Sequence, residues 1–236
     1  MFVSKLSCPN NRYYVYKLPK LTTNQDPLIK EGVAFYYLDI SQQNFKLSTA
    51  SLKDMSQPVA QTLQQIYNSS PGEVNCYLKL FYSVNILTIQ SQSTSGVVAY
   101  DDNNGFWMIH SVPKFPRKFG PYAWADNANR NGQSILCVSF KSDQMDNIAH
   151  QLLYNHPYVY HGNLPQDLLP IAQTFQQVVS GSFVPDPPFY KKVTLWSSGG
   201  QKFGHYAKYS SFGKGNMSCP YPMSCKITSN WYKYTK

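Results

Sequence analysis

Short stretches rich in aromatic and β-branched residues recur along the chain, several of them alternating between apolar and polar positions. That pattern is typical of strands that bury one or both faces. The first such stretch is residues 12–18, which Pro19 ends. Further stretches lie at residues 32–39, 74–82 and 134–140. The pattern therefore predicts a sheet of several short strands.

Two pairs of stretches are close enough to form hairpins. Residues 96–101 and 106–112 are separated by Asp-Asn-Asn-Gly at 102–105, and Asn and Gly tolerate the positive φ of a tight turn. Asp101 and Asp102 are therefore interpreted as turn residues. Residues 193–196 and 203–209 form a second hairpin-like pair around Gly199 and Gly200.

Apolar residues spaced by three and four predict three amphipathic helices. The first spans residues 48–67 and is interrupted near Pro58. The second begins at Ser142 or Asp143 and ends at His156-Pro157. The third spans residues 167–179. This order of strands and helices favours an α/β fold, a mixed β-sheet sandwich flanked by helices.

The 236 residues fit one large domain or two closely packed halves. A proline-rich link at residues 185–188 marks the natural division. No segment approaches the roughly 18 apolar residues of a membrane span, so we expect no membrane partner. The start at Met1 is too short and polar for a secretory signal, which predicts that a signal peptide is absent from this sequence.

The chain carries 21 Lys and Arg against 12 Asp and Glu, a net charge of +9, together with 19 Tyr, 13 Phe and 4 Trp. Basic and aromatic residues together favour a polyanionic partner over a cationic one, although a merely solvated basic face is the preferred explanation of the charge by itself. The strongest local candidate is residues 114–119, where Lys114, Arg117 and Lys118 accompany two phenylalanines. Such a segment could contact phosphates and stack on bases, or form a solvated loop.

The five cysteines lack the spacing of a zinc site, and no carboxylate or histidine completes a set with Asp101 and Asp102, so we expect no metal and no cofactor. Cys219 and Cys225 could close a small loop, and Cys76 lies in an apolar run that predicts a buried thiol. Two sequons, at Asn68 and Asn216, lie in polar stretches. Together these features favour an oxidising compartment.

Four motifs carry a resemblance to a known family: GVVAYD at 96–101, GFWMIHSVP at 105–113, GQSILCVSF at 132–140 and AKYSSFG at 207–213. They resemble the deoxyribonuclease II family of metal-independent acid endonucleases. The resemblance implies a phospholipase D-like fold of two related halves, with residues 1–184 as the first and 185–236 as the start of a truncated second half, packed as one domain. It also implies a secreted or lysosomal protein and a disulfide between Cys8 and Cys137.

The resemblance further implies a catalytic pair of His-x-Lys triplets, in which one histidine attacks phosphorus, the other protonates the leaving oxygen, and the lysines neutralise phosphate oxygens. Here Ser93 and Ser95 occupy the positions of the first triplet's His and Lys, and the chain stops at Lys236 before the second. A serine hydroxyl has no basic lone pair near neutral pH and needs its own activating base. His110 matches a family histidine associated with activity; its alternative role is packing within the hairpin.

Three functions stay open. In the first, the chain is a deoxyribonuclease II-like protein that has lost hydrolysis and retains weak, sequence-independent DNA binding through Lys114, Arg117, Lys118 and Lys208. Alternatively, it is part of an active acid nuclease completed by a missing segment or a partner chain. As a third alternative, it is a secreted, non-enzymatic interaction protein that binds host or extracellular proteins. The sequence leaves open a homodimer.

Overall fold

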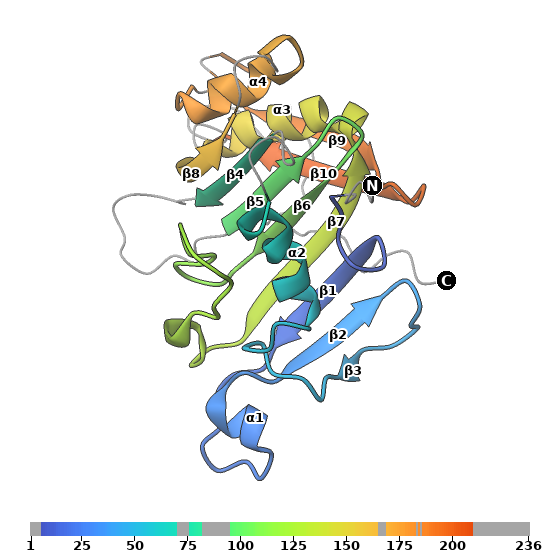
Figure 1. The fold of residues 1–236 in the computed structure, drawn as a ribbon. Helices are drawn as coiled ribbons and strands as arrows, with labels where there is room; N and C mark the ends of the chain where they lie inside the picture. Colours follow the sequence, from blue (N-terminus) through green and yellow to red (C-terminus); the bar gives the residue numbers. More distant parts are fainter. Residues whose placement is uncertain are drawn as a thin grey trace, which may run out of the picture.

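The computed structural model describes residues 6–69, 76–81, 95–164, 169–182, 184 and 186–209. Its centre is an antiparallel eight-stranded sheet with the order β3-β2-β1-β7-β6-β5-β4-β8 (Figure 1). The strands are β1 (Arg12–Lys17), β2 (Phe35–Asp39), β3 (Lys46–Leu47), β4 (Cys76–Phe81), β5 (Ser95–Tyr100), β6 (Asn104–His110), β7 (Gln133–Lys141) and β8 (Tyr158–Asn163). A separate hairpin consists of β9 (Tyr190–Trp196) and β10 (Lys202–Lys208).

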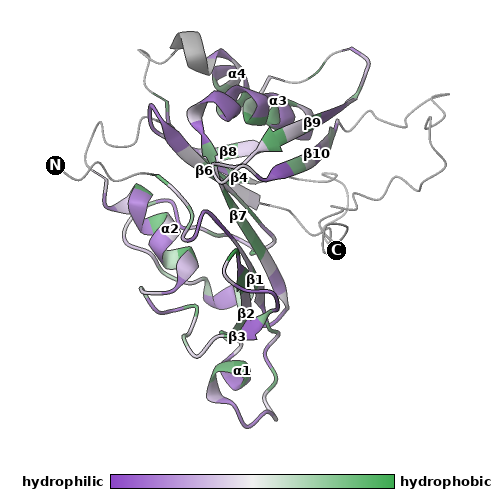
Figure 2. Ribbon diagram, turned by 90° about the vertical axis from the view of Figure 1, so that its right-hand side faces the viewer, coloured by the Kyte–Doolittle hydropathy of each residue, from purple (hydrophilic) through white to green (hydrophobic). Residues whose placement is uncertain are grey.

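The helices are α1 (Pro27–Glu31), α2 (Pro58–Tyr67), α3 (Met145–Asn155) and α4 (Leu169–Val179), with 3₁₀ turns η1 (Asp126–Ala128) and η2 (Ser142–Gln144). Helix α2 covers one face of the large sheet, whereas α3 and the β9–β10 hairpin lie on the other (Figure 2). This arrangement confirms the predicted α/β fold, a sheet flanked by helices, and is consistent with the phospholipase D-like fold that the resemblance implies.

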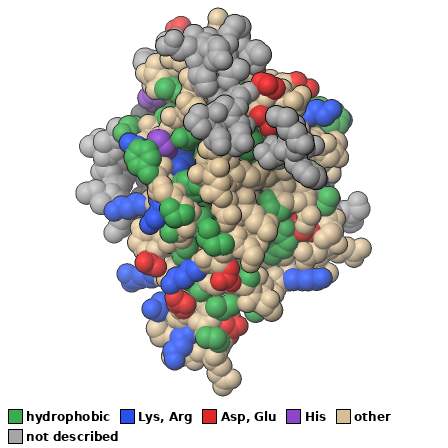
Figure 3. Space-filling view, viewed as in Figure 1, with side chains coloured by type: hydrophobic (Ala, Val, Ile, Leu, Met, Phe, Trp, Pro, Cys, Tyr) green, Lys and Arg blue, Asp and Glu red, His purple; other side chains and the backbone are tan. Residues whose placement is uncertain are grey.

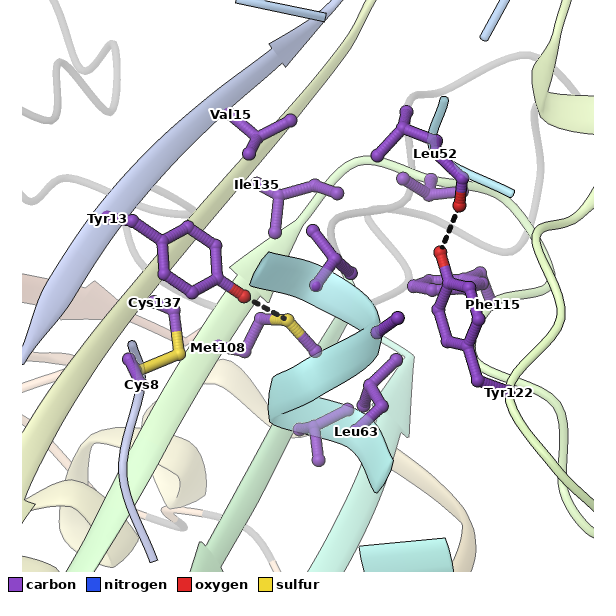
Figure 4. Close-up of a cluster of buried hydrophobic side chains, with 14 of the residues drawn as sticks. Cys8, Tyr13, Val15, Leu52, Leu63, Met108, Phe115, Tyr122, Ile135 and Cys137 are labelled. Carbon is purple, nitrogen blue, oxygen red and sulfur yellow. Dashed lines mark hydrogen bonds between the residues drawn. A yellow bond between two sulfur atoms is a disulfide. The ribbon is translucent and has the colours of Figure 1, made fainter. Parts of the chain in front are cut away.

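The two faces of the sheet have separate cores because successive strand side chains point to opposite sides. In β6, Phe106 and Met108 join the core under α2, and Trp107 joins the core under α3. Figure 4 shows the first core, where the Tyr13 hydroxyl lies near the Met108 sulfur and the Tyr122 hydroxyl donates to the Leu52 carbonyl. The alternation expected for the strand at 106–112 is confirmed.

The disulfide between Cys8 and Cys137 ties the segment before β1 to the middle of β7, across a sequence separation of 129 residues (Figure 4). The Cys8 amide also donates to the Ser139 hydroxyl oxygen at 2.8 Å. The pairing that the resemblance implied for these two cysteines is therefore present. Both residues are buried in the first core.

The β5–β6 hairpin forms where it was predicted, but its turn uses a different mechanism. None of residues 101–105 has a positive φ. Instead, the Asp101 carboxylate accepts hydrogen bonds from the amides of Asn103 and Asn104, each at 2.8 Å. Gly105 is needed for space, because a Cβ there would lie 2.5 Å from the Ala99 carbonyl oxygen.

The helix predicted for residues 48–67 was wrong in its first half. Helix α2 begins at Pro58, whose fixed φ and missing N–H suit the first turn, and the Gln57 side chain accepts from the Val59 amide at 2.7 Å. Pro58 therefore starts the helix instead of interrupting it, and Met55 is exposed. Strand β8, which pairs with β4, was not predicted.

The β9–β10 hairpin packs on the second core and does not stand apart from the first part of the chain. Leu195 and Phe203 are buried in that core, and the Ser198 amide donates to the Ser139 carbonyl at 2.8 Å. The division at residues 184 and 185 stays a prediction. Within the described residues, no helix is long and apolar enough to cross a membrane.

Candidate functional site

The position of the family's first triplet ends at the start of β5. Ser93 lies outside the described residues, whereas Ser95 is the first residue of β5 and pairs with His110 at the end of β6. Both side chains are buried, at 0% and 2% exposure. The fold therefore brings together two of the residues that the sequence singled out.

His110 faces the core under α2. Its ring meets Phe115 edge-on at 5.5 Å, and neither ring nitrogen has a good hydrogen bond within the described part of the chain. Burial lowers the pKa of His110 to about 3, and the nearby Val112 backbone opposes that shift only in part. The imidazole is therefore neutral at mildly acidic pH, when an exposed histidine would be protonated.

The hydroxyl of Ser95 also lacks a hydrogen-bond partner among the described residues. Serine and histidine are thus adjacent across two strands, yet no hydrogen bond joins them as nucleophile and base. The catalytic role of His110 stays a prediction. No group of three His, Cys, Asp or Glu side chains in the described ranges could hold a metal ion.

Residues 114–119 separate into inward and outward side chains. Phe115 and Pro116 are buried, and Phe115 packs against Trp124 with ring centroids 5.3 Å apart. Lys114, Arg117, Lys118 and Phe119 are exposed. Of the two rings that the sequence left undecided, one anchors the segment and the other lies at the surface.

Three side chains donate hydrogen bonds to backbone carbonyls of this segment. The Tyr160 hydroxyl donates to the Pro116 carbonyl at 2.6 Å, and the Tyr67 hydroxyl donates to the Arg117 carbonyl at 2.7 Å. The Lys79 ammonium donates to the carbonyls of Arg117 and Lys118 at 3.0 and 3.1 Å. Because the carbonyls point inward, the cationic side chains of Arg117 and Lys118 are left to the solvent.

Lys79 is itself a buried cation. It is 1% exposed, its ammonium lies 4.2 Å from the centroid of the Tyr67 ring, and burial lowers its pKa to about 8. Lys17 is also a buried lysine, and it donates to the carbonyls of Ala128 and Asn129 at 2.7 and 2.6 Å. The two lysines therefore fix the connection between β6 and β7 at two places.

Aromatic residues adjoin the basic segment at the surface. Phe119 is 67% exposed, and its ring lies 4.7 Å from that of His161 on β8. The Lys118 ammonium lies 5.1 Å from the Phe119 centroid. Burial, then the charges of Lys79 and Lys118, lower the pKa of His161, so the surroundings of this ring are positive. Figure 3 shows Lys and Arg side chains along the left edge of this face, with hydrophobic and His side chains beside them at the upper left.

The fold does not bring Lys208 to this surface. Lys208 ends β10, on the side of the sheet that carries the second core, whereas Phe115 belongs to the first core. The predicted nucleic-acid contacts therefore divide into Lys114, Arg117 and Lys118 on one side and Lys208 on the other. His205, three residues before Lys208, has a packing role, since it forms a 2.8 Å hydrogen bond with Gln151 and its ring centroid lies 4.8 Å from that of Trp107.

Other predicted site residues are less informative. Asn68 is exposed at the end of α2, where a sequon can be reached. Asn216, Cys219 and Cys225 lie outside the described residues. Sequence reasoning missed Lys79, and the signal that could have found it is a lysine placed between apolar residues of a buried strand.

Comparison with known proteins agrees with the motifs. The sequence model described as deoxyribonuclease II matches residues 11–217. Plancitoxin-1 of Acanthaster planci is 37% identical over 221 residues, which cover 89% of this chain and 62% of the relative. Cell death-related nuclease 6 of Caenorhabditis elegans is 34% identical, covering 86% and 54%.

A mammalian relative is similar at a comparable level. Deoxyribonuclease-2-alpha of Rattus norvegicus is 31% identical over 211 residues, which cover 87% of this chain and 60% of the relative. The chain thus spans less than two thirds of the length of each of these relatives.

Proposed function

The chain belongs to the deoxyribonuclease II family, and on that premise we propose that it binds duplex DNA through residues 114–119 without hydrolysing it. The observation that carries this proposal is the anchoring of residues 116–118, whose carbonyls are held inward while Arg117 and Lys118 point to the solvent.

Fixed cations favour phosphate binding for an entropic reason. A segment whose backbone is already ordered loses little conformational freedom when it meets a ligand, so more of the electrostatic attraction appears as affinity. Lys114, Arg117 and Lys118 bind phosphates without reading bases, which predicts sequence-independent binding. A net charge of +9 adds long-range attraction for any polyanion.

The absence of hydrolysis is supported by the chemistry around Ser95. A hydroxyl at the position of the family's lysine supplies no positive charge for phosphate oxygens, and its side chain is fully buried. His110 lies beside it, but a buried imidazole with a pKa near 3 is neutral at mildly acidic pH and cannot donate a proton there as a general acid.

The cell compartment is part of the same proposal. A buried disulfide between Cys8 and Cys137 is typical of proteins that fold in an oxidising environment. Asn68 is exposed and followed by Ser70, which suits glycosylation in the secretory pathway. We place the protein in secretions or in lysosomes.

Plasmid relaxation tests the loss of hydrolysis. Supercoiled plasmid is incubated with the protein at about pH 5 in the presence of a chelator, with an active deoxyribonuclease II as positive control. We expect no nicking above the buffer control. Nicking that disappears in His110→Ala would overturn the proposal and make His110 a catalytic residue.

The salt dependence of duplex binding tests the interface. Each phosphate contact contributes about 0.9 to the slope of log K against log salt, so Arg117→Ala with Lys118→Ala should flatten the slope by nearly two. The matched control is Lys30→Ala with Lys46→Ala, which removes the same charge from exposed positions on α1 and β3. Equal slopes for the two double variants, or no duplex binding at low salt, would rule out residues 114–119 as the DNA interface.

A further inference from the structure

The outward face of the β9–β10 hairpin carries lysines and aromatic rings in cross-strand pairs. Trp196 lies opposite Lys202, Lys192 opposite Tyr206, and Tyr190 opposite Lys208. We call these six residues the Lys–aromatic ladder. Between the first two pairs lies the small pair of Thr194 and Gly204.

Two of the pairs bring an ammonium group close to a ring, and all three rings are partly exposed. The Lys202 ammonium lies 4.7 Å from the centroid of the Trp196 ring, and the Lys192 ammonium lies 5.3 Å from that of Tyr206. Trp196 and Tyr190 are each 45% exposed and Tyr206 is 56% exposed. Neither strand contains Asp or Glu, so the ladder is positive along its whole length.

Packing of the hairpin does not require these outward residues. The opposite face of the hairpin buries Leu195, Phe203 and Ala207 against the second core. That inner face, together with the hydrogen bonds from the backbone amides of Ser198 to the Ser139 carbonyl and of Trp196 to the Gln144 side chain, accounts for the docking of the hairpin. Trp196 and Tyr206 on the other face are therefore exposed to a ligand.

We propose that the Lys–aromatic ladder binds single-stranded nucleic acid, with unpaired bases stacked on Trp196 and Tyr206 and phosphates bound by Lys192, Lys202 and Lys208. Exposed aromatic side chains on a sheet, flanked by cations, are the usual means of binding unpaired bases without sequence preference. In a duplex the bases are already stacked and paired, so their faces cannot reach flat rings.

The dimensions of the ladder fit an extended strand. Trp196 and the residue opposite Tyr206 are four residues apart on β9, which corresponds to about 13 Å along a strand. The small Thr194–Gly204 pair leaves room for the nucleotide between the two rings. In the free protein the ammonium groups of Lys192 and Lys202 lie over the rings of Tyr206 and Trp196. A stacking base would take the ring face, and the ammonium can move to the adjacent phosphate.

This surface goes beyond the proposed duplex interface and is separate from it. The ladder lies on the β9–β10 hairpin, which is on the same face of the sheet as α3 (Figure 2). Residues 114–119 are anchored by Phe115 in the first core, on the other face. Each surface can therefore be removed without changing the other.

The test measures binding of a fluorescently labelled oligothymidylate of 15 nucleotides by anisotropy, at low salt. Trp196→Ala and Tyr206→Ala should each weaken binding about fivefold or more, whereas Trp196→Phe and Tyr206→Phe, which keep a ring, should stay close to wild type. Tyr158→Ala is the matched control, because Tyr158 is a 69% exposed tyrosine on the edge strand β8. Its affinity should equal that of the wild type.

Intrinsic fluorescence gives a second readout that does not depend on the stability of the alanine variants. Stacking of thymine on Trp196 should quench part of the tryptophan emission, and Trp196→Phe should abolish that part while it retains the affinity. Trp107 and Trp124 are buried and should not respond. Quenching that is unchanged in Trp196→Phe would contradict stacking at this site.

Failure of this inference can be distinguished from failure of the proposed function. Arg117→Ala with Lys118→Ala should weaken duplex binding but leave oligothymidylate binding nearly unchanged, and Trp196→Ala with Tyr206→Ala should do the reverse. The absence of oligothymidylate binding by the wild type, or an equal loss in Tyr158→Ala, overturns the ladder. A ladder variant that changes only the oligomeric state also overturns the inference, because the rings would then contact a second copy of the chain.

Discussion

At the scale of single residues, the least ordinary position is His110. A buried imidazole with no good hydrogen bond in the described structure is destabilising, because its N–H loses water without gaining a partner. Ser95 adds a second unpartnered polar group beside it. Such groups often persist where a site once needed or still needs them, which agrees with the site positions that the resemblance implies for them.

Protonation of His110 makes stability depend on pH. The unfolded imidazole takes up a proton near pH 6.5, whereas the folded one does so only near pH 3. The unfolded state therefore binds more protons between these values, so the free energy of unfolding should fall as the pH is lowered from about 6.5 towards 3. His205, whose pKa burial lowers to about 4, acts in the same direction.

We predict that His110→Leu, which keeps a similar volume, reduces this pH dependence by up to about 1.4 kcal/mol per pH unit. It should also be neutral or stabilising at pH 7, because it removes the unpartnered nitrogens. Urea denaturation at several pH values between 4 and 7 measures both effects. Equal slopes for His110→Leu and wild type would refute the assignment.

At the scale of elements, the basic segment is held by side chains from α2, β4 and β8, and the one from β4 is a buried cation. Lys79 extends from β4 to the carbonyls of Arg117 and Lys118, so a buried cation orders the backbone of exposed cations. Lys17 on β1 does the same for Ala128 and Asn129. Among the described residues, each ammonium group donates to main-chain oxygens and not to a carboxylate.

This arrangement predicts different effects for two similar substitutions. Lys79→Met and Lys17→Met each remove charge-assisted hydrogen bonds and should each lower the free energy of unfolding by about 2 kcal/mol. Only Lys79→Met should also weaken duplex DNA binding several-fold, because it releases Arg117 and Lys118 without removing either. Chemical denaturation and duplex binding at fixed salt measure the two effects. Equal DNA affinities for the two variants would show that anchoring does not matter for the interface.

At the scale of the whole molecule, the antiparallel sheet separates two cores and two charged surfaces. The disulfide from Cys8 to Cys137 fixes the segment before β1 to the central strand β7. Strands β1 and β7 are also paired by backbone hydrogen bonds, so the disulfide reinforces a contact between distant parts of the sequence. Its main effect should be on the unfolded chain, which it restricts.

Removal of the disulfide should therefore lower the stability of the folded chain. Cys8→Ser with Cys137→Ser closes no loop in the unfolded state and should lower the free energy of unfolding on the order of 4 kcal/mol. Thermal unfolding with and without reductant measures this: reductant should lower the midpoint of the wild type to near that of the double variant. Identical midpoints for wild type and double variant under oxidising conditions would contradict a formed bond.

The sequence by itself determined the features that depend on near neighbours. The period of two placed Phe106 and Met108 opposite Trp107, and the spacing of three and four identified α3, because both periods follow from local backbone geometry. The motifs of residues 96–140 identified the family. Local pattern failed at residues 48–57, where apolar spacing resembled a helix but Pro58 favours a helix start.

Only the tertiary structure decided which of these residues are exposed and what they contact. Lys79 meets its carbonyl partners 38 and 39 residues away, and Lys17 meets its partners 111 and 112 residues away. The sequence likewise could not separate Lys208 from Lys114, or show that Phe115 is buried while Phe119 is exposed. Such contacts arise when distant strands pair and loops fold over them, and no local periodicity encodes them.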